Sequence, residues 1–221
     1  MPIRRWVMAA AAVAGVVISA AGPSAIALAQ SAKKVAASPQ AAPSPVDRKG
    51  LLVAARSWGY QLQELDAGKL AKSAYDVLVI DFPGGDGRGF GAKEIAQLKR
   101  KPDGGRRLVI AYMNVGEAED YRYYWRKAWE KAPPPWMGSA NCRWKGDHRV
   151  RHWAPEWQAI LFGKPGSYLD RIIKAGFDGV YLDRVDIYYY WRNERGQGAA
   201  DMVDLVAKLS EWAKAREPGF L

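Results

Sequence analysis

The sequence predicts an α/β fold in which parallel strands alternate with helices. Three short apolar runs are of the kind that form strands buried on both faces, and each of them stops on a carboxylate. The runs are residues 77–81, 108–117 and 179–183, ending on Asp81, Glu117 and Asp183. Helical segments separate the runs, which is typical of a parallel sheet covered by helices. Because the carboxyl ends of parallel strands meet at one edge, the three acids predict an active site there.

The first 29 residues predict a secretory signal peptide. Arg4 and Arg5 precede an apolar stretch, and the small residues at positions 27–29 fit cleavage after Ala29. The stretch is short and rich in Ala and Gly for a membrane span; the alternative is an uncleaved anchor. We therefore expect a secreted or periplasmic protein without stable membrane insertion after cleavage. Residues 30–49, rich in Ala, Ser, Pro and Lys, predict a disordered linker.

Residues 50–221 are enough for one domain with a sizeable core. Cys142 is the only cysteine, so an exported chain has no internal disulfide. The net charge of +10 indicates attraction to anionic envelope polymers or membranes, or simply solubility. Neither a long Lys/Arg run nor a zinc-finger spacing occurs, and with export this argues against nucleic-acid binding. The sequence leaves the oligomeric state open.

Hydrophobic runs and turn residues place the elements of this domain in order. We expect strands within residues 51–63, 75–81, 108–115 and 177–183. We expect helices or helical turns at residues 65–73, 92–100, 118–129, 155–162, 167–175 and 199–215. Residues 133–153 contain three consecutive prolines and predict a long irregular segment, whose length indicates a functional role.

Two other segments are weak candidates for cofactor or metal binding. The glycine-rich residues 84–91 resemble a dinucleotide fingerprint only in part, because no strand-end acid follows about 20 residues later. A loop at the rim of the site explains them better. Cys142, His148 and His152 match no standard zinc spacing. We therefore expect neither a cofactor nor a metal.

Carboxylates gather at or just beyond the predicted strand ends. They are Asp81, Glu117, Glu119, Asp120, Asp183 and Asp186. Closely placed acids push their pKa values apart, which yields one proton donor and one ionised group, as glycoside hydrolysis requires. For Glu119, Asp120 and Asp186 the alternative is a first-turn helix acid or a solvated loop charge. Packing explains Glu117 and Asp183 less well.

Tryptophan and tyrosine side chains cluster after the same strand ends. Examples are Tyr123, Trp153 and residues 188–191. Aromatic faces pack against the C–H faces of sugar rings, so aromatic residues beside acids favour a polysaccharide cleft. The alternative is that many of these rings wedge helices against the sheet.

Five ordered segments carry a resemblance to a known family. They are residues 60–63, 75–81, 111–122, 150–157 and 176–186, and they include G-E-A-E-D-Y-R and G-F-D-G-V-Y-L-D. With them the chain resembles glycoside hydrolase family 114, the endo-α-1,4-polygalactosaminidase-like TIM-barrel proteins. The resemblance spans essentially all of the folded part.

The resemblance implies a (β/α)8 barrel that hydrolyses a polysaccharide, one that could contain galactosamine, without a cofactor. It implies that Asp183 is a catalytic carboxylate, acting as the nucleophile. The proton donor is either Glu117 or, as the resemblance favours, a Glu on a later strand. With the acids and aromatics above, we assign substrate binding to Asp81, Tyr112, Glu119, Tyr123, Trp153, Tyr181 and Asp186.

Proteins of this family usually place their second catalytic carboxylate, a Glu, on a later strand. A full barrel needs about 250 residues, whereas residues 50–221 hold about four strand–helix units. We therefore expect a TIM-barrel-type domain truncated to its N-terminal half. The alternative function is a non-catalytic carbohydrate- or envelope-binding protein.

Overall fold

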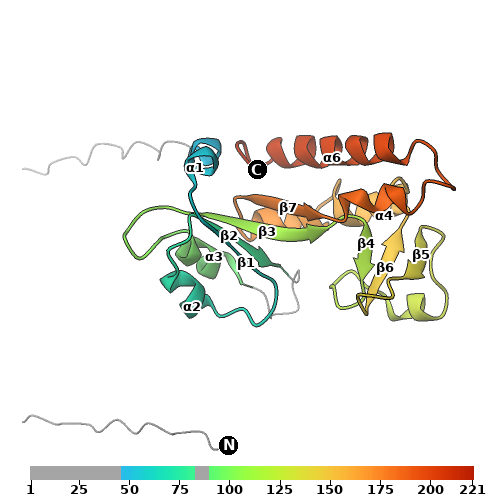
Figure 1. Cartoon of the computed structure of the whole chain (residues 1–221), viewed down its shortest axis with the longest axis horizontal. Helices are drawn as coiled ribbons and strands as arrows, with labels where there is room; N and C mark the ends of the chain where they lie inside the picture. Colours follow the sequence, from blue (N-terminus) through green and yellow to red (C-terminus); the bar gives the residue numbers. More distant parts are fainter. Residues whose placement is uncertain (1–45, 83–89) are drawn as a thin grey trace, which may run out of the picture. The chain divides into compact units, whose positions relative to one another are not determined.

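Four parallel strands form the central sheet, in the order β1-β2-β3-β7 (Figure 1). The computed structural model describes residues 46–82 and 90–221. The strands are β1 (Trp58–Gln61), β2 (Val77–Asp81), β3 (Leu108–Asn114) and β7 (Gly179–Asp183). The predicted α/β class and the four predicted parallel strands are therefore confirmed.

Six α-helices accompany the sheet in the described part of the chain. They are α1 (Arg48–Ala54), α2 (Ala67–Lys72), α3 (Ala92–Leu98), α4 (Pro155–Leu161), α5 (Tyr168–Lys174) and α6 (Gly198–Lys214). The sequence predicted α2 to α6. It missed α1, which begins inside the predicted linker at residues 30–49. The Asp47 carboxylate accepts the backbone N–H of Gly50 at 2.8 Å and caps this helix, so the end of the predicted linker is corrected.

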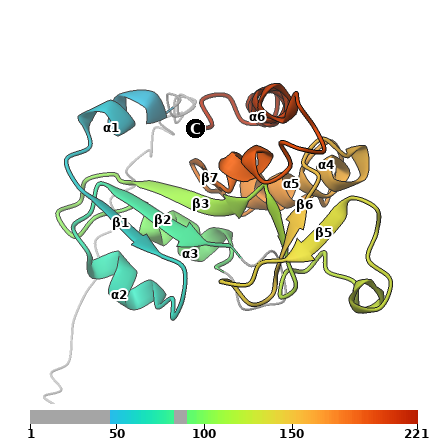
Figure 2. The same ribbon diagram turned by 45° about the vertical axis from the view of Figure 1, so that its right-hand side comes forward.

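The predicted helix at residues 118–129 is wrong. Residues 117–119 instead form β4 (Glu117–Glu119), which pairs with β6 (Asp147–Val150), and β6 pairs with β5 (Met137–Ala140). The backbone pairing of β4 with β6 outweighs the helical spacing of the aromatics that follow. Only a short 3₁₀ helix, η1 (Lys127–Glu130), forms in the remainder. Figure 2 shows this antiparallel sheet beyond the carboxyl end of β3.

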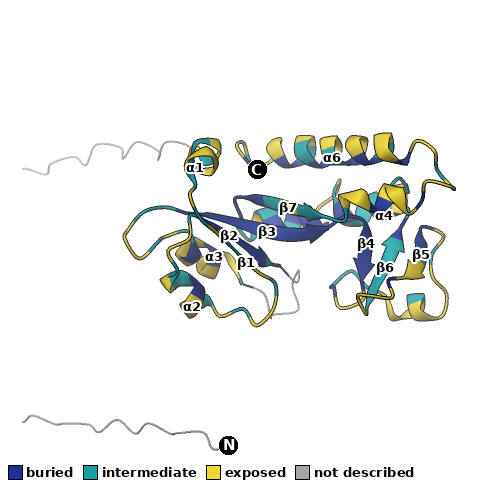
Figure 3. Cartoon of the chain, viewed as in Figure 1, coloured by how far each residue is buried: buried dark blue, intermediate teal, exposed yellow. Residues whose placement is uncertain are grey.

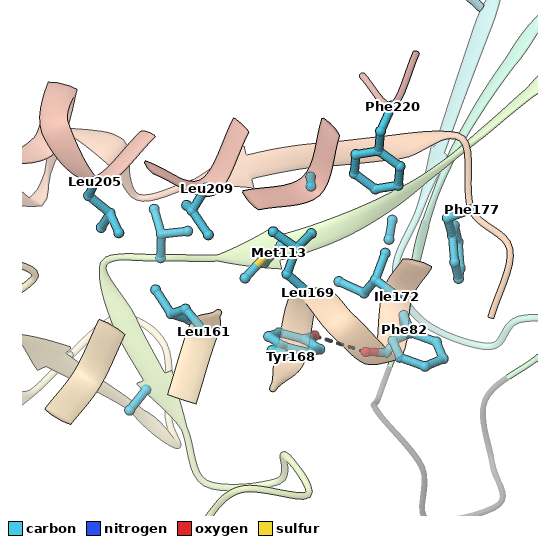
Figure 4. Close-up of a cluster of buried hydrophobic side chains, with 14 of the residues drawn as sticks. Phe82, Met113, Leu161, Tyr168, Leu169, Ile172, Phe177, Leu205, Leu209 and Phe220 are labelled. Carbon is cyan, nitrogen blue, oxygen red and sulfur yellow. Dashed lines mark hydrogen bonds between the residues drawn. The ribbon is translucent and has the colours of Figure 1, made fainter. Parts of the chain in front are cut away.

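One face of the parallel sheet carries the main hydrophobic core. Leu78 and Ile80 of β2 and Met113 of β3 meet apolar side chains from α2 to α6 on this face. Figure 4 shows the part around Tyr168 and Phe177, where the Tyr168 hydroxyl donates to the Phe82 carbonyl at 2.8 Å. The β3 strand is buried along its whole length, which explains its continuous apolar sequence (Figure 3).

The opposite face of the sheet is less covered. Its buried residues are Val77, Val79, Leu108, Ile110 and Tyr112. An apolar cavity of about 500 Å³ opens on this face, beside α1. Further toward the carboxyl edge the same face turns polar, because strand register places Asp81, Tyr112 and Tyr181 in one row. Each strand therefore supplies apolar side chains first and functional groups at its end.

A buried carboxylate organises the amino edge of the sheet. Asp178 precedes β7, is fully buried and accepts the backbone N–H of Val109 at 3.0 Å. Its other oxygen lies 3.0 Å from Arg48 Nε, 2.9 Å from Lys99 Nζ and 2.6 Å from Arg106 Nη2. Burial lowers the pKa of Lys99, which contacts Asp178. One acid thus links α1 and the loop before β3 to β7.

Several predictions made for the chain's ends and loops are untested. The predicted signal peptide with cleavage after Ala29, most of the linker and most of the glycine-rich residues 84–91 lie outside the described residues. Among the helices that are described, none has the length and apolar character needed to cross a membrane.

Replacing Asp178 with Ala is expected to lower the free energy of unfolding by about 3–5 kcal/mol, because three cations lose their buried partner. Urea denaturation measures this loss. The matched control is Asp204→Ala, which removes an exposed acid paired with Lys208 at 2.6 Å and should cost less than about 1 kcal/mol. Equal losses for the two variants would contradict the role given to Asp178.

Candidate active site

A cleft of about 720 Å³ lies at the carboxyl edge of the parallel sheet. It brings together five of the predicted site residues: Asp81, Tyr112, Glu117, Glu119 and Asp183. The other lining residues are Tyr60, Leu62, Gln63, Tyr121, Arg122, Trp144, Lys145, Asp147 and Arg184. The cleft therefore lies between the ends of the parallel strands and the small antiparallel sheet.

Asp183 ends β7 and is held by two donors. The Tyr112 hydroxyl donates to Oδ2 at 2.6 Å, and the backbone N–H of Arg184 donates to Oδ1 at 2.8 Å. Burial and this hydrogen bond raise the pKa of Tyr112 well above its usual range, so the tyrosine remains a donor. These contacts fix the orientation of the Asp183 carboxylate.

Arg184 adopts a strained backbone conformation directly after Asp183. Its φ of 61° lies in the left-handed region, which costs a residue with a side chain roughly 1–3 kcal/mol. Gly116 permits this corner, because a Cβ there would lie 2.3 Å from the Arg184 carbonyl oxygen. The turn after β3 and the corner after β7 are therefore in close backbone contact. Such strain is typical of functional sites.

Glu117 is almost fully buried beside this corner. Its Oε1 accepts from Asn141 Nδ2 at 2.9 Å and lies 3.3 Å from Arg184 Nη2. Burial raises the pKa of Glu117, while Arg184 and Asn141 oppose the rise. The backbone N–H of Glu117 donates to Asn114 Oδ1 at 2.9 Å, which orients the residue after β3. The side chain can therefore retain a proton at a higher pH than an exposed glutamate.

The buried Arg122 side chain forms ion pairs with two acids of the cleft. Its Nε lies 2.6 Å from Glu119 Oε2, and its Nη1 lies 2.8 Å from Asp81 Oδ1. Burial raises the pKa of Asp81, and the charge of Arg122 opposes this rise. The Tyr121 hydroxyl donates to the other oxygen of Glu119 at 2.5 Å. Arg122 thus neutralises part of the acidic cluster and fixes Asp81 and Glu119.

Asp147 adds an acid that sequence reasoning did not select. It stands opposite Glu119 in the register of β4 and β6, a like-charge arrangement that normally destabilises a sheet. Burial, Glu119 and Glu117 together raise the pKa of Asp147 to about 7. Nothing in the packing explains such a pair, which favours a functional origin.

Four predicted site residues lie outside the cleft lining. Tyr123 stacks under Arg171 and donates to the Gly166 carbonyl at 3.1 Å. Trp153 packs against His152 and Trp191. Asp186 is largely exposed on the 3₁₀ helix η2 (Val185–Tyr189). Tyr181 lines the neighbouring apolar cavity; it lies beside Tyr112 in the strand register and makes an edge-on contact with Tyr60.

Sequence signals for the missed residues differ. Arg122 ends the G-E-A-E-D-Y-R segment, and an arginine beside three acids is a signal for a buried counter-charge. Asp147 lies in the segment predicted to be irregular and carries no such signal. Over the described ranges, no three His, Cys, Asp or Glu side chains are grouped to hold a metal ion. His152 is fully buried with Nε2 2.9 Å from the Gly198 carbonyl oxygen.

Residues 33–220 match the model of glycoside-hydrolase family GH114. An uncharacterized protein of Thermotoga maritima is 38% identical over 169 residues, which are 75% of this chain and 50% of that protein. An uncharacterized protein of Methanocaldococcus jannaschii is 40% identical over 163 residues, covering 71% of this chain and 44% of that protein. The chain thus spans about half the length of these curated relatives.

A solved structure with the same fold is the glycoside hydrolase domain of PelA from Pseudomonas aeruginosa. It superposes with a TM-score of 0.53 at 20% identity and covers 75% of this chain and 58% of that domain. At this identity the likeness concerns the fold alone. The parallel α/β sheet is therefore structurally similar to TIM-barrel glycoside hydrolases.

The Asp147 carboxyl is expected to titrate with a midpoint near pH 7 in a ¹³C NMR titration. Because the folded state keeps a proton that the unfolded chain loses near pH 3.8, the free energy of unfolding should fall between about pH 4 and 7. The loss is at most about 4 kcal/mol at ~1.4 kcal/mol per pKa unit, and solvent screening reduces it.

Asp147→Asn removes the titrating group, so this variant should lack that part of the pH dependence and be more stable than the parent chain above pH 7. Urea denaturation at pH 4.5 and pH 8 checks the difference. A carboxyl midpoint near pH 4, or the same pH dependence in both proteins, would contradict the electrostatics described for the cleft.

Proposed function

Because the chain belongs to glycoside hydrolase family GH114, we propose that it hydrolyses O-glycosidic bonds of a polysaccharide in the acid-lined cleft. The observation that supports this most directly is that Asp183, Glu117 and Tyr112 line one cleft and that two donors fix Asp183. Glycoside hydrolysis uses two carboxyl groups, one protonated and one ionised. No cofactor is part of the proposal.

In this proposal Asp183 attacks or stabilises the anomeric carbon. Its orientation is fixed before substrate arrives, since Tyr112 and the Arg184 backbone bind both oxygens. Glu117 is the proton donor, supported by the raised pKa that its burial causes. Asp81 and Glu119, held by Arg122, would bind sugar hydroxyl or amino groups.

The charge of the cleft supports a galactosamine-containing substrate. Five acids line the cleft against three basic residues, although the whole chain carries +10. A locally acidic cleft attracts a cationic amino-sugar polymer that the basic protein would otherwise repel. The exposed aromatic rings of Tyr121 and Trp144 at the cleft can pack against sugar faces.

We also propose that the protein is exported. The support is the order of Arg4–Arg5, an apolar stretch and the small residues before Gln30. Export would bring the cleft to polysaccharides outside the cytoplasm. N-terminal sequencing of protein recovered outside the cytoplasm should begin at Gln30; a product that retains Met1 or starts elsewhere would contradict cleavage after Ala29.

The alternative is carbohydrate binding without cleavage. The contacts that favour it are those of Glu117, whose Oε1 is occupied by Asn141 and Arg184 and is thereby less free to transfer a proton. Binding of a galactosamine oligomer without release of new reducing ends would support the alternative. Release of reducing ends would exclude it.

Asp183→Asn should lower the rate of reducing-end release from partially deacetylated polygalactosamine by about 10²–10⁴-fold or more, because a positioned carboxylate is lost. Asp186→Asn is the matched control, since Asp186 is exposed three residues further along and should keep full activity. Circular dichroism confirms folding of both variants. An Asp183→Asn variant with parental activity would overturn the assignment.

A further inference from the structure

A second surface of the molecule combines exposed tyrosine rings with two arginines that form no salt bridge to any described acid. We define the arginine–tyrosine surface as Ser139, Arg149, Tyr189, Tyr190 and Arg192. It joins the small antiparallel sheet, seen in Figure 2, to the segment that follows β7. None of the five residues lines the acidic cleft, so the surface is a separate feature.

The two arginines stack on the two rings. The Arg149 guanidinium lies 4.5 Å from the centre of the Tyr190 ring, and the Arg192 guanidinium lies 4.2 Å from that of Tyr189. Arg149 Nη1 also donates to Ser139 Oγ at 3.1 Å and to the Ala140 carbonyl at 2.8 Å. Stacking and these hydrogen bonds fix the direction of each planar charge and lower the entropy that a ligand would have to remove.

The charge of this surface is neutralised only in part: Arg149 stands opposite Glu117 in the β4–β6 register, and its charge lowers the pKa of that acid. Among the described residues, Arg149 and Arg192 form no ion pair, whereas their neighbours Arg151 and Arg195 are paired with Glu194 and Asp201. Each of the two free guanidinium groups uses Nη1 for protein contacts. Their remaining donors are available for a planar anion such as a carboxylate, which a guanidinium binds in a bidentate manner.

The support beneath the surface is rigid. Trp191 is buried, its indole N–H donates to the Val150 carbonyl at 2.8 Å, and its ring fills the space that a Cβ on Gly138 would need. Trp191 therefore fixes the segment that carries Tyr189 and Tyr190 against β5 and β6. A rigid base preserves the spacing of the charged groups, which a recognition surface requires.

From these observations we propose that the arginine–tyrosine surface is a non-catalytic docking site for a carboxylated polysaccharide of the uronic-acid type. Tyr189 is 64% exposed and Tyr190 45% exposed, so both rings offer apolar area to a sugar face. The guanidinium groups beside the rings can bind the carboxylate that each uronate residue carries. The site would hold the protein on an acidic matrix while the acidic cleft acts on a different polymer.

The test measures binding of soluble alginate, a uronic-acid polymer, by isothermal titration calorimetry. Arg149→Gln combined with Arg192→Gln should weaken alginate binding at least tenfold. The matched control combines Arg126→Gln with Arg216→Gln, which removes two exposed arginines that also stack on aromatic rings, at Trp129 and Trp212. This control should change the affinity less than twofold.

Further arms separate the ligand classes. Tyr189→Leu should weaken alginate binding several-fold and leave the binding of double-stranded DNA unchanged, and neutral dextran should not bind. Equal weakening by the test and control pairs would overturn the proposal, as would DNA binding that is tighter than alginate binding and equally sensitive to the test pair. Asp183→Asn should bind alginate normally, so the result is independent of the proposed hydrolysis.

Discussion

The buried guanidinium of Arg122 holds the acidic edge of the sheet together. It joins Asp81 at the end of β2 to Glu119 on β4, and it also donates to the Phe82 carbonyl at 3.1 Å. That carbonyl accepts the hydroxyl of Tyr168, a fully buried core residue. The cleft is thereby connected to the main core through one carbonyl oxygen. Without this cation, the acids around Asp81 would repel one another in a poorly solvated site.

The two edges of the parallel sheet use charge in opposite ways. At the amino edge, one buried acid, Asp178, is surrounded by three cations and serves to connect elements. At the carboxyl edge, acids outnumber bases, and burial together with the nearby Glu119 and Glu117 raises the pKa of Asp147. A protein with a net charge of +10 therefore contains an acidic cleft. This local reversal of charge arises because the fold brings acids from different segments together. The amino-acid composition alone does not show it.

The four parallel strands and five of the helices could be predicted because apolar runs and turn residues determine them locally. The same runs gave the acids at the strand ends, and parallel pairing then places Asp81 and Asp183 at one edge. The β4–β6 pairing could not be predicted, since it joins residues that lie about 30 positions apart and competes with a helical spacing of aromatics. Asp147 was missed for that reason. Tyr123 and Trp153 were assigned to substrate because sequence does not separate rings that face a cleft from rings that pack helices.

The central claim is that the acid-lined cleft receives the sugar chain that is hydrolysed. A crystal structure of the Asp183→Asn variant with a galactosamine oligosaccharide tests it most directly. The account predicts a sugar ring in the cleft, in contact with the side chains at positions 81, 112 and 183. An oligosaccharide bound only in the apolar cavity beside Tyr181, or only on the arginine–tyrosine surface, would contradict the claim.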